Sequence, residues 1–397
     1  MKPFDLKAFT PADVADPYPV YREYRAAGPV HHNGEAWHVF GYDAVARVLT
    51  SRDYGRRGPG GGATPVPGSH DTLRRLVENW LVFLDPPRHT ALRSLLAKEF
   101  SPKVVTDLRA RVRVIAEELV GDIGDVTEID LVETFAAPLP ILVISELLGV
   151  PADLRGWFRG RALDLQEAST ARAARNPDAL SRADAAAAEL VEFFTGHLRD
   201  RGPDDEDLVA LLANARRRGA ALTDDEIVAT CVHLLTAGHE TTTNLISKSV
   251  LALLAHPGAL GRLRAEPALL PQAVEELNRF DTPVQMVTRW AQQDAELAGV
   301  RIRRGEKVVL VLGSANRDPA AFPDPDRLDL RRDARRHCGF GLGIHYCLGA
   351  ALARAEAEIG LATLLTSFPG LHRGGDPVRY AADLVFHGPA RLPLRTR

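Results

Sequence analysis

The chain has 397 residues, of which 45% are hydrophobic and 25% are charged, and its formal net charge is −3. These are ordinary values for a globular protein, so they disfavour disordered, collagen-like and coiled-coil architectures. A charge balance this close to neutral gives no overall electrostatic reason to bind nucleic acid or an anionic membrane. The three cysteines, Cys231, Cys338 and Cys347, are too few for a secreted disulfide framework, so a functional cysteine would act as a thiolate.

The length alone suggests two or three domains at roughly 100–200 residues per domain, although large single-domain enzymes also reach it. Residues 1–21 contain prolines and acidic residues where a signal peptide needs an apolar stretch. No other window approaches about 18 consecutive apolar residues. We therefore expect a soluble, cytoplasmic protein that does not contact a membrane.

Most of the sequence has helical periodicity, and its strand signals are short. The first predicted strand is Trp37–Phe40. Apolar residues repeat at spacings of three and four over the predicted helices Val104–Val120, Ser181–Arg201, Thr223–Ala255 and Leu348–Phe368. Two further strands are predicted over Glu296–Ile302 and Lys307–Leu312, around a turn at Arg304 and Gly305.

The segment Gly55–Gly68 contains glycine or proline at nine of its fourteen positions, too many for a helix or a strand. It is either a linker between domains or a loop that gates a site within one domain. Composition alone favours the linker. The gating loop becomes the better interpretation if the segments on both sides of it serve the same site.

The helix predicted over Thr223–Ala255 starts with a capping box, in which Thr223 and Glu226 satisfy each other's backbone donors. Pro257 should end it, after about 50 Å at 1.5 Å per residue. Its middle, Thr236–Thr243, contains a glycine and several threonines, which are poor helix formers. This stretch is either a tolerated weak spot or a thin, hydroxyl-bearing surface for something that packs against it.

The glycine-rich run Phe340–Gly349 contains Cys347 immediately before the last predicted helix. A helix N-terminus lowers the pKa of a thiol by only about one unit. Full ionisation therefore requires a metal, which deprotonates a coordinating thiol outright. The alternative is that Cys347 is a small buried hydrophobic residue, and the surrounding glycines disfavour it.

Zinc is a further alternative, because four possible ligands lie within eleven residues: His337, Cys338, His345 and Cys347. The Cys-x8-Cys and His-x-Cys spacings are not those of the usual structural zinc sites, and a phenylalanine and two glycines intervene. The sequence therefore disfavours zinc.

The run Phe340–Gly349 resembles the haem-binding loop of the cytochrome P-450 family, F-x-x-G-x-x-x-C-x-G, with Cys347 as the axial thiolate ligand of haem iron. Other signatures of that family follow in the expected order, at His89–Arg93, Ala237–Thr241, Glu276–Arg279, Ala315–Pro319 with Phe322, and Pro325–Leu328. The departures from the family pattern are Asn278, Leu328 and Gly339, and none removes a group that the mechanism needs.

The resemblance covers essentially the whole chain and is greatest to soluble actinobacterial members that modify natural products. It implies a mainly α fold with small β-sheets, a helical prism that encloses haem b. It also implies that residues 1–397 form one domain with no fused reductase. The segment Gly55–Gly68 is then better interpreted as a lid.

The resemblance implies that the two haem propionates are bound by His89, Arg93, Arg289 and His345. Buried carboxylates need such partners, and His89 and Arg93 lie four residues apart on one helical face. The further residues implied to contact haem are Ala237, Gly238, Phe340, Gly341 and Gly349.

The resemblance also implies a buried network of Glu276, Arg279 and Arg327 that supports folding and haem retention. Thr241 and Glu240 are the residues to which we assign chemistry. The family reaction splits dioxygen, which requires protons in a site that is otherwise dry. A hydroxyl can hold a water there, and a neighbouring carboxylate can relay protons inward. Gly238 lacks a Cβ, which leaves room for dioxygen.

Two residues near these motifs have plainer interpretations, His239 as a helix-surface histidine and Cys231 as a buried apolar residue. A basic cluster before the haem loop is either a solvated face or a docking surface for an acidic ferredoxin, supplied by a ferredoxin reductase. Its members are Arg331, Arg332, Arg335 and Arg336. We expect a monomer.

The sequence thus predicts a monooxygenase that inserts one oxygen atom into a C–H bond or an alkene. Alternatives are a haem-thiolate enzyme that couples, desaturates or rearranges its substrate, and a non-catalytic haem sensor. A peroxide-driven enzyme is disfavoured, because its family pattern replaces the acid-threonine pair with Arg-Pro. The substrate is expected to be a hydrophobic small molecule, such as a secondary-metabolite intermediate. The residues implied to surround it are Gly55–Val82, Phe83, Leu234, Ala237, Val284, Gln285 and Val287.

Overall fold

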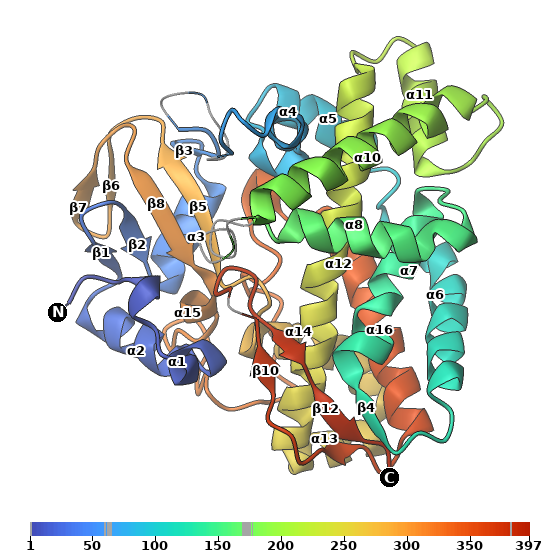
Figure 1. Ribbon diagram of the computed structural model, residues 1–397. Helices are drawn as coiled ribbons and strands as arrows, with labels where there is room; N and C mark the ends of the chain where they lie inside the picture. Colours follow the sequence, from blue (N-terminus) through green and yellow to red (C-terminus); the bar gives the residue numbers. More distant parts are fainter. Residues whose placement is uncertain (1, 59–60, 62–65, 169–175, 177, 382) are drawn as a thin grey trace.

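The protein is mainly helical, with several small sheets (Figure 1). The computed structural model describes the chain except for residues 1, 59–60, 62–65, 169–175, 177 and 382. Its α-helices are α1 (Pro11–Ala15), α2 (Tyr18–Ala27), α3 (Tyr42–Thr50), α4 (Asp71–Glu78), α5 (Arg88–Leu96), α6 (Pro102–Ile123), α7 (Pro138–Leu147), α8 (Arg155–Gln166), α10 (Ala179–Asp200), α11 (Leu208–Arg217), α12 (Asp224–Ala255), α13 (Pro257–Ala265), α14 (Leu270–Phe280), α15 (Leu312–Asn316) and α16 (Ala350–Ser367).

Short helical turns connect several of these helices. They are η1 (Leu6–Ala8), η2 (Leu81–Phe83), η4 (Ala152–Leu154), η5 (Pro267–Leu269), η6 (Gly343–His345) and one π-helical turn, η3 (Val132–Ala136). The strands are β1 (Val30–His32), β2 (Trp37–Val39), β3 (Tyr54–Gly55), β4 (Glu128–Asp130), β5 (Met286–Ala291), β6 (Ala295–Leu297), β7 (Val300–Ile302), β8 (Lys307–Val311), β9 (His372–Arg373), β10 (Arg379–Tyr380), β11 (Pro389–Arg391) and β12 (Pro393–Arg395).

The largest sheet has five strands in the order β1-β2-β8-β5-β3 and lies at one side of the molecule, away from α6 and α16 (Figure 1). Only the β2–β8 pair is parallel. The sheet brings β2, from the start of the chain, next to β8, more than 250 residues later. It therefore joins the N-terminal segment to the segment that precedes the cysteine loop.

Helix α12 runs through the middle of the molecule (Figure 1) and packs against α7, α10, α14 and α16. The predicted capping box is present: Thr223 Oγ1 accepts from the Glu226 amide at 3.2 Å, and the Glu226 carboxylate accepts from the Thr223 amide at 2.9 Å. Pro257 opens α13 instead of continuing α12, because proline has no backbone donor. Most of α12 is buried, so tertiary packing compensates for the weak helix formers in Thr236–Thr243, and the helix is unbroken there.

The four long predicted helices are confirmed as α6, α10, α12 and α16, and the predicted fold class is confirmed. The single strand predicted over Glu296–Ile302 is wrong. Ala298 and Gly299 have φ values of 48° and 81°, and this turn divides the segment into the hairpin β6–β7. β8 starts after the predicted turn at Arg304 and Gly305, but it pairs with β2 and β5.

Candidate functional site

The cysteine loop is built from two tight backbone turns that lead into α16. Gly341 and Gly343 have φ values of 69° and 70°, which favour glycine over residues with a side chain. A Cβ on Gly343 would also collide with the Leu49 carbonyl at the end of α3. The Cys347 amide donates to the Phe340 carbonyl at 2.8 Å, which closes the loop. The side chain of Cys347 is therefore held by backbone geometry just before the first turn of α16.

The Cys347 side chain is not covered by neighbouring protein atoms, yet the surrounding protein shields it from bulk water. Both statements hold if the thiol faces a recess within the fold. Burial raises the pKa of the thiol, and the Gly349 amide with the guanidinium groups of Arg93 and Arg354 opposes this rise. The protein alone thus leaves Cys347 protonated near neutral pH, and a bound metal is needed to ionise it.

Besides the recess at Cys347, a face of α12 that neighbouring protein does not cover lies halfway along the helix. Ala237 is exposed although its neighbours on both sides along α12 are buried or half-buried, and Thr241 is half-buried. A Cβ on Gly238 would meet no atom within 4 Å. The Thr241 hydroxyl donates to the Ala237 carbonyl at 2.9 Å. This face of α12 therefore borders open space, as expected for residues that lie against a ligand.

The predicted propionate ligands come together from three segments of the chain. The rings of His89, on α5, and His345, in η6, have centroids 4.2 Å apart. Burial lowers the pKa of His345 to about 2, and the charges of Arg289, on β5, and Arg93, on α5, reinforce the shift. The predicted set thus forms one electropositive cluster.

Arg56 joins this cluster, although no sequence motif points to it. Burial and then the charge of Arg56 lower the pKa of Arg289 to about 9. The charge of Asp85 opposes this shift and the fall that burial causes in the pKa of Arg56, and its carboxylate accepts hydrogen bonds from the backbone amides of Arg56 and Arg57 at 2.8–3.0 Å. Arg56 is half-buried and lies within the glycine-rich segment, where composition gave no sign of such a cation.

This cluster needs anions that the described residues do not supply. Within the described ranges, Arg56, Arg93 and Arg289 form no ion pair. His89 is 1% exposed, and neither of its ring nitrogens has a hydrogen-bond partner. A buried cation without an ion pair, such as Arg289, and ring nitrogens without a partner are destabilising. The cluster therefore fits the two carboxylates of haem, while Cys347 fits the thiolate ligand of its iron.

Glu276 and Arg279 form the predicted buried pair on α14, and both side chains are fully buried. Arg279 Nε and Nη2 donate to the two carboxylate oxygens at 2.7 and 2.9 Å. Arg279 Nη1 also donates to the carbonyls of Asn316 and Pro325, at 2.8 and 2.9 Å. The pair thus ties α14 to the segment that precedes the cysteine loop.

The predicted membership of Arg327 in this network is wrong. Its side chain is 70% exposed and lies 3.6 Å from Asp329. The Asp329 amide donates to Glu276 at 3.0 Å, which leaves the earlier Arg327 facing outward. Arg332 folds back in its place, with Nε 3.2 Å from Glu276. Arg332, one of the four arginines of the predicted docking surface, therefore has a structural role.

Two further predicted roles are also wrong. Gln285, predicted to contact substrate, is fully buried, and its amide donates to the Tyr18 hydroxyl and the Thr282 carbonyl at 3.1 and 2.8 Å. It points into the core beside the N-terminal helices. His239, interpreted as a surface residue, is 2% exposed and lies 3.1 Å from the Gln166 amide.

The other predicted substrate residues have mixed surroundings. Phe83, Val284 and Val287 are half-buried, whereas Leu234 is buried. The predicted lid, Gly55–Gly68, lies partly outside the described residues, at 59–60 and 62–65. Cys231 is buried, and burial raises its pKa.

Gly339 and Asn278, two residues that depart from the family pattern, lie against each other. A Cβ on Gly339 would lie 2.5 Å from Asn278 Oδ1, which accepts a hydrogen bond from Thr282 at 3.3 Å. Asn278 is buried, so it has little room to move. Glycine at 339 therefore accommodates asparagine at 278.

A charged network behind the cysteine loop was not predicted. Glu275, on α14, accepts from Arg354 at 3.0 Å and lies 3.2 Å from the His337 ring. Although burial opposes it, these hydrogen bonds lower the pKa of Glu275 to about 2. Arg354 lies over the Phe340 ring at 4.4 Å and donates to the Tyr346 hydroxyl at 3.1 Å. The network anchors the loop to α14 and α16, and no local sequence pattern links its members.

A zinc site is not formed by the nearby cysteine and histidines. Cys338 is buried. In the described part of the chain, no three His, Cys, Asp or Glu side chains lie close enough together to bind a metal ion. His337 is paired with Glu275 instead.

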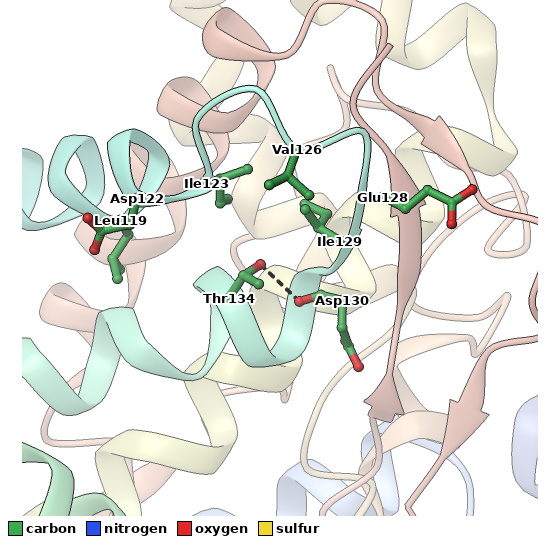
Figure 2. Close-up of a pocket in the computed structure, with 8 residues that line it drawn as sticks. All are labelled: Leu119, Asp122, Ile123, Val126, Glu128, Ile129, Asp130 and Thr134. Atoms are coloured by element: carbon green, nitrogen blue, oxygen red, sulfur yellow. Dashed lines mark hydrogen bonds between the residues drawn. The ribbon is translucent and has the colours of Figure 1, made fainter.

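A surface hollow of about 320 Å³ lies where α6 ends and β4 begins. Figure 2 shows eight of its lining residues, among them Thr134, whose hydroxyl donates to the Asp130 carbonyl at 2.9 Å. None of the residues of the cysteine site lines this hollow. The two features are therefore separate.

Comparisons with known proteins agree with this site. A model of the cytochrome P-450 family matches residues 172–379. The chain is 40% identical over 407 residues to the cytochrome P-450 monooxygenase PikC of Streptomyces venezuelae, across 99% of this chain and 94% of that protein. It is 37% identical over 386 residues to the mycinamicin IV hydroxylase/epoxidase of Micromonospora griseorubida, across 94% of each. Its fold is similar to the crystal structure of CalO2, with a TM-score of 0.89, 33% identity, and 100% and 99% of the two chains covered.

The chain belongs to the cytochrome P-450 family, and it is a haem-thiolate monooxygenase with haem b as its cofactor. Enzymes of this family act on small molecules with dioxygen and electrons from a redox partner. No helix in the described part of this chain is long and apolar enough to cross a bilayer.

Proposed function

We propose that this enzyme hydroxylates or epoxidises a hydrophobic small molecule, with electrons supplied by a ferredoxin and its reductase. The substrate class is that of secondary-metabolite intermediates. The similarity to the mycinamicin IV hydroxylase/epoxidase of Micromonospora griseorubida supports this class. We further propose that residues 1–397 act as one monomeric domain in the cytoplasm, where reduced nicotinamide cofactors are available.

The proposal rests on two neighbouring groups of residues that each lack a ligand and that one cofactor would complete. Cys347 is a recessed thiol that needs a metal, and the cluster around His345 needs two anions. Haem supplies both, together with the chemistry that activates dioxygen. We assign Cys347 to the iron, and His89, Arg93, Arg289 and His345 to the propionates. Arg56 adds a further cation beside them.

Proton delivery is assigned to Thr241 and Glu240 on α12. The Thr241 hydroxyl donates to the Ala237 carbonyl, so its oxygen keeps lone pairs that can accept from a water. A water held there can pass a proton to the open space beside Gly238. Glu240 is half-buried and one residue away, which suits a group that exchanges protons between solvent and site.

The ferredoxin surface is assigned to Arg331, Arg335 and Arg336, which are exposed near the cysteine loop. Arg331 pairs with Glu266 at 2.6 Å and Arg335 with Asp333 at 2.7 Å. Such exposed pairs contribute little to stability, so an acidic partner can replace the existing partners at small cost.

The proposal is tested with haem-loaded protein, a ferredoxin and its reductase. The reduced carbon monoxide complex of the wild type should have the long-wavelength Soret band of a thiolate ligand, and Cys347→Ser should lose it. Compounds that shift the haem spin state are then supplied as substrates, and oxygenated products are sought by mass spectrometry. Substrate-dependent NAD(P)H consumption without any oxygenated product would favour coupling or desaturation, and no consumption at all would favour a sensor.

A further inference from the structure

Two cations hold the residue immediately before Cys347 from opposite ends. Arg93, on α5, donates to the backbone carbonyl of Tyr346 at 2.6 Å. Arg354, on α16, donates to the hydroxyl of the same tyrosine at 3.1 Å. Burial raises the pKa of the Cys347 thiol, and both guanidinium groups oppose this rise. Two positive charges from separate helices therefore act on the sulfur.

The two cations differ in what balances their charge. Arg93 is assigned to the haem propionates, whereas Arg354 has its counter-ion within the protein. Its Nη2 donates to Glu275 at 3.0 Å, and its Nε donates to the other oxygen of that carboxylate. Arg354 also lies 4.4 Å from the centre of the Phe340 ring, and the Phe340 carbonyl accepts from the Cys347 amide at 2.8 Å. Arg354 thus contacts the cysteine loop and its counter-ion at the same time.

The third member of this network, His337, is a neutral ring. The Gly339 amide donates to His337 Nδ1 at 2.9 Å, so this nitrogen carries no proton. The ring proton lies on Nε2, which donates to the Glu275 carboxylate at 3.2 Å. His337 is buried, so the ring is held in this orientation. The network therefore contains one cation, Arg354, and one anion, Glu275.

A fixed charge near a redox centre shifts its reduction potential. Reduction adds one negative charge, which a nearby cation stabilises and a nearby anion destabilises. Charges and hydrogen bonds around the metal ligand are among the means by which a protein adjusts a haem potential. Arg354 touches the loop through Phe340 and Tyr346, whereas Glu275 reaches the loop through Arg354 and His337. The cation should therefore have the larger effect of the two.

We propose that Arg354 and Glu275 set the reduction potential of the haem bound by Cys347. Arg354 raises the potential by stabilising the added negative charge, and Glu275 lowers it by balancing Arg354. A higher potential favours electron transfer from the ferredoxin. Both are positioning residues, because they act through the cysteine loop. This inference rests on the proposed binding of haem iron by Cys347.

The test measures the midpoint potential of the haem-loaded protein by spectroscopic titration with a reductant. Arg354→Met removes the cation and keeps an apolar chain against Phe340. The equilibrium constant for one-electron reduction should then fall about tenfold, or ~59 mV. Glu275→Gln removes the anion and keeps a hydrogen-bonding side chain, and the constant should rise about threefold. The double variant should lie between the two single variants.

A purely structural role would give a different pattern, because both substitutions loosen the same loop. Shifts of the potential in one direction for both variants would overturn the proposal. Arg354→Lys keeps the charge and should stay within about twofold of the wild type. The matched control is the pair of Arg109, on α6, and Glu358, one turn further along α16, which are 2.8 Å apart. Arg109→Met and Glu358→Gln should each change the constant by less than about twofold.

The Soret band of the reduced carbon monoxide complex is recorded for every variant. A wild type without the long-wavelength band would overturn Cys347 as the ligand, and this inference with it. A wild type that has the band, with an unchanged potential in Glu275→Gln, would overturn this inference alone. If Arg354→Met loses the band, the other two variants decide. A raised potential in Glu275→Gln with an unchanged one in Arg354→Lys supports the proposal, and any other result contradicts it.

Discussion

Glu356 lies on α16, nine residues after Cys347, and its carboxyl group is 3% exposed. Burial raises its pKa to about 8, and a hydrogen bond with Thr242 of α12 opposes the shift only in part. The folded state therefore favours the protonated acid. The stability that this group contributes is complete below about pH 4.5, the ordinary value, and is lost as the pH rises through about 8.

We predict that Glu356→Gln removes this pH dependence, because the amide stays neutral. The free energy of unfolding of the haem-loaded wild type should fall between pH 5 and pH 9 relative to that of the variant. Chemical denaturation of both proteins at pH 5, 7 and 9 measures the difference. Parallel curves over that range would mean that Glu356 is ionised in the folded protein.

At the scale of an element, α12 combines a structural and a functional role. Its threonines donate to carbonyls four residues earlier, Thr241 to Ala237 and Thr243 to His239, each at 2.9 Å. Thr243 is buried in the core, whereas Thr241 lies on the open face. Two chemically identical side chains on one helix can thus be compared directly.

Thr241→Ala should keep haem and substrate binding, since alanine is the better helix former. Without the hydroxyl, protons reach the site less readily, and reducing equivalents should be diverted to hydrogen peroxide. We expect about a tenfold fall in product formed per NAD(P)H consumed. Peroxide and product are measured in the same turnover assay. Thr243→Ala is the control that should keep coupling, and unchanged coupling in Thr241→Ala would contradict the assigned role.

At the scale of the whole molecule, a buried charged network joins the two ends of the chain to α12. Lys248 is 1% exposed, and its Nζ lies 2.8 Å from Asp281 and 2.7 Å from the His387 ring. Tyr18, near the N-terminus, donates to Asp281 at 2.8 Å. His387 Nε2 lies 2.6 Å from the Val14 carbonyl. This network thus ties α1, α2 and the C-terminal segment around His387 to α12.

Lys248→Ala should lower the free energy of unfolding by about 3–5 kcal/mol, because it leaves the Asp281 carboxylate without its cation. Thermal or chemical denaturation of the haem-loaded protein measures the loss. The double variant Lys248→Met with Asp281→Asn removes both charges and should recover part of the stability. A double variant as unstable as the sum of its single changes would show that the pair is not coupled.

Much of the site could be predicted because its chemistry is local in sequence. The loop Phe340–Gly349 carries its glycines and cysteine within ten residues, and Glu276 and Arg279 lie within one helical turn. Errors arose where a side chain could turn in more than one direction. Arg327 and Arg332 are both basic residues of the same loop, and the folded path of that loop brings Arg332 to Glu276 while Arg327 faces outward.

Length and cysteine count by themselves disfavoured a secreted disulfide scaffold, and local motifs indicated the haem-thiolate class, the long central helix and its N-terminal cap. The tertiary structure alone decided which distant groups meet. Arg56 joins the propionate cluster, Trp80 stacks on His233, and Gln285 turns into the core. The physical reason is that helical period, capping and backbone turns act within a few residues. Burial and charge pairing depend on segments that the fold brings together from far apart in the chain.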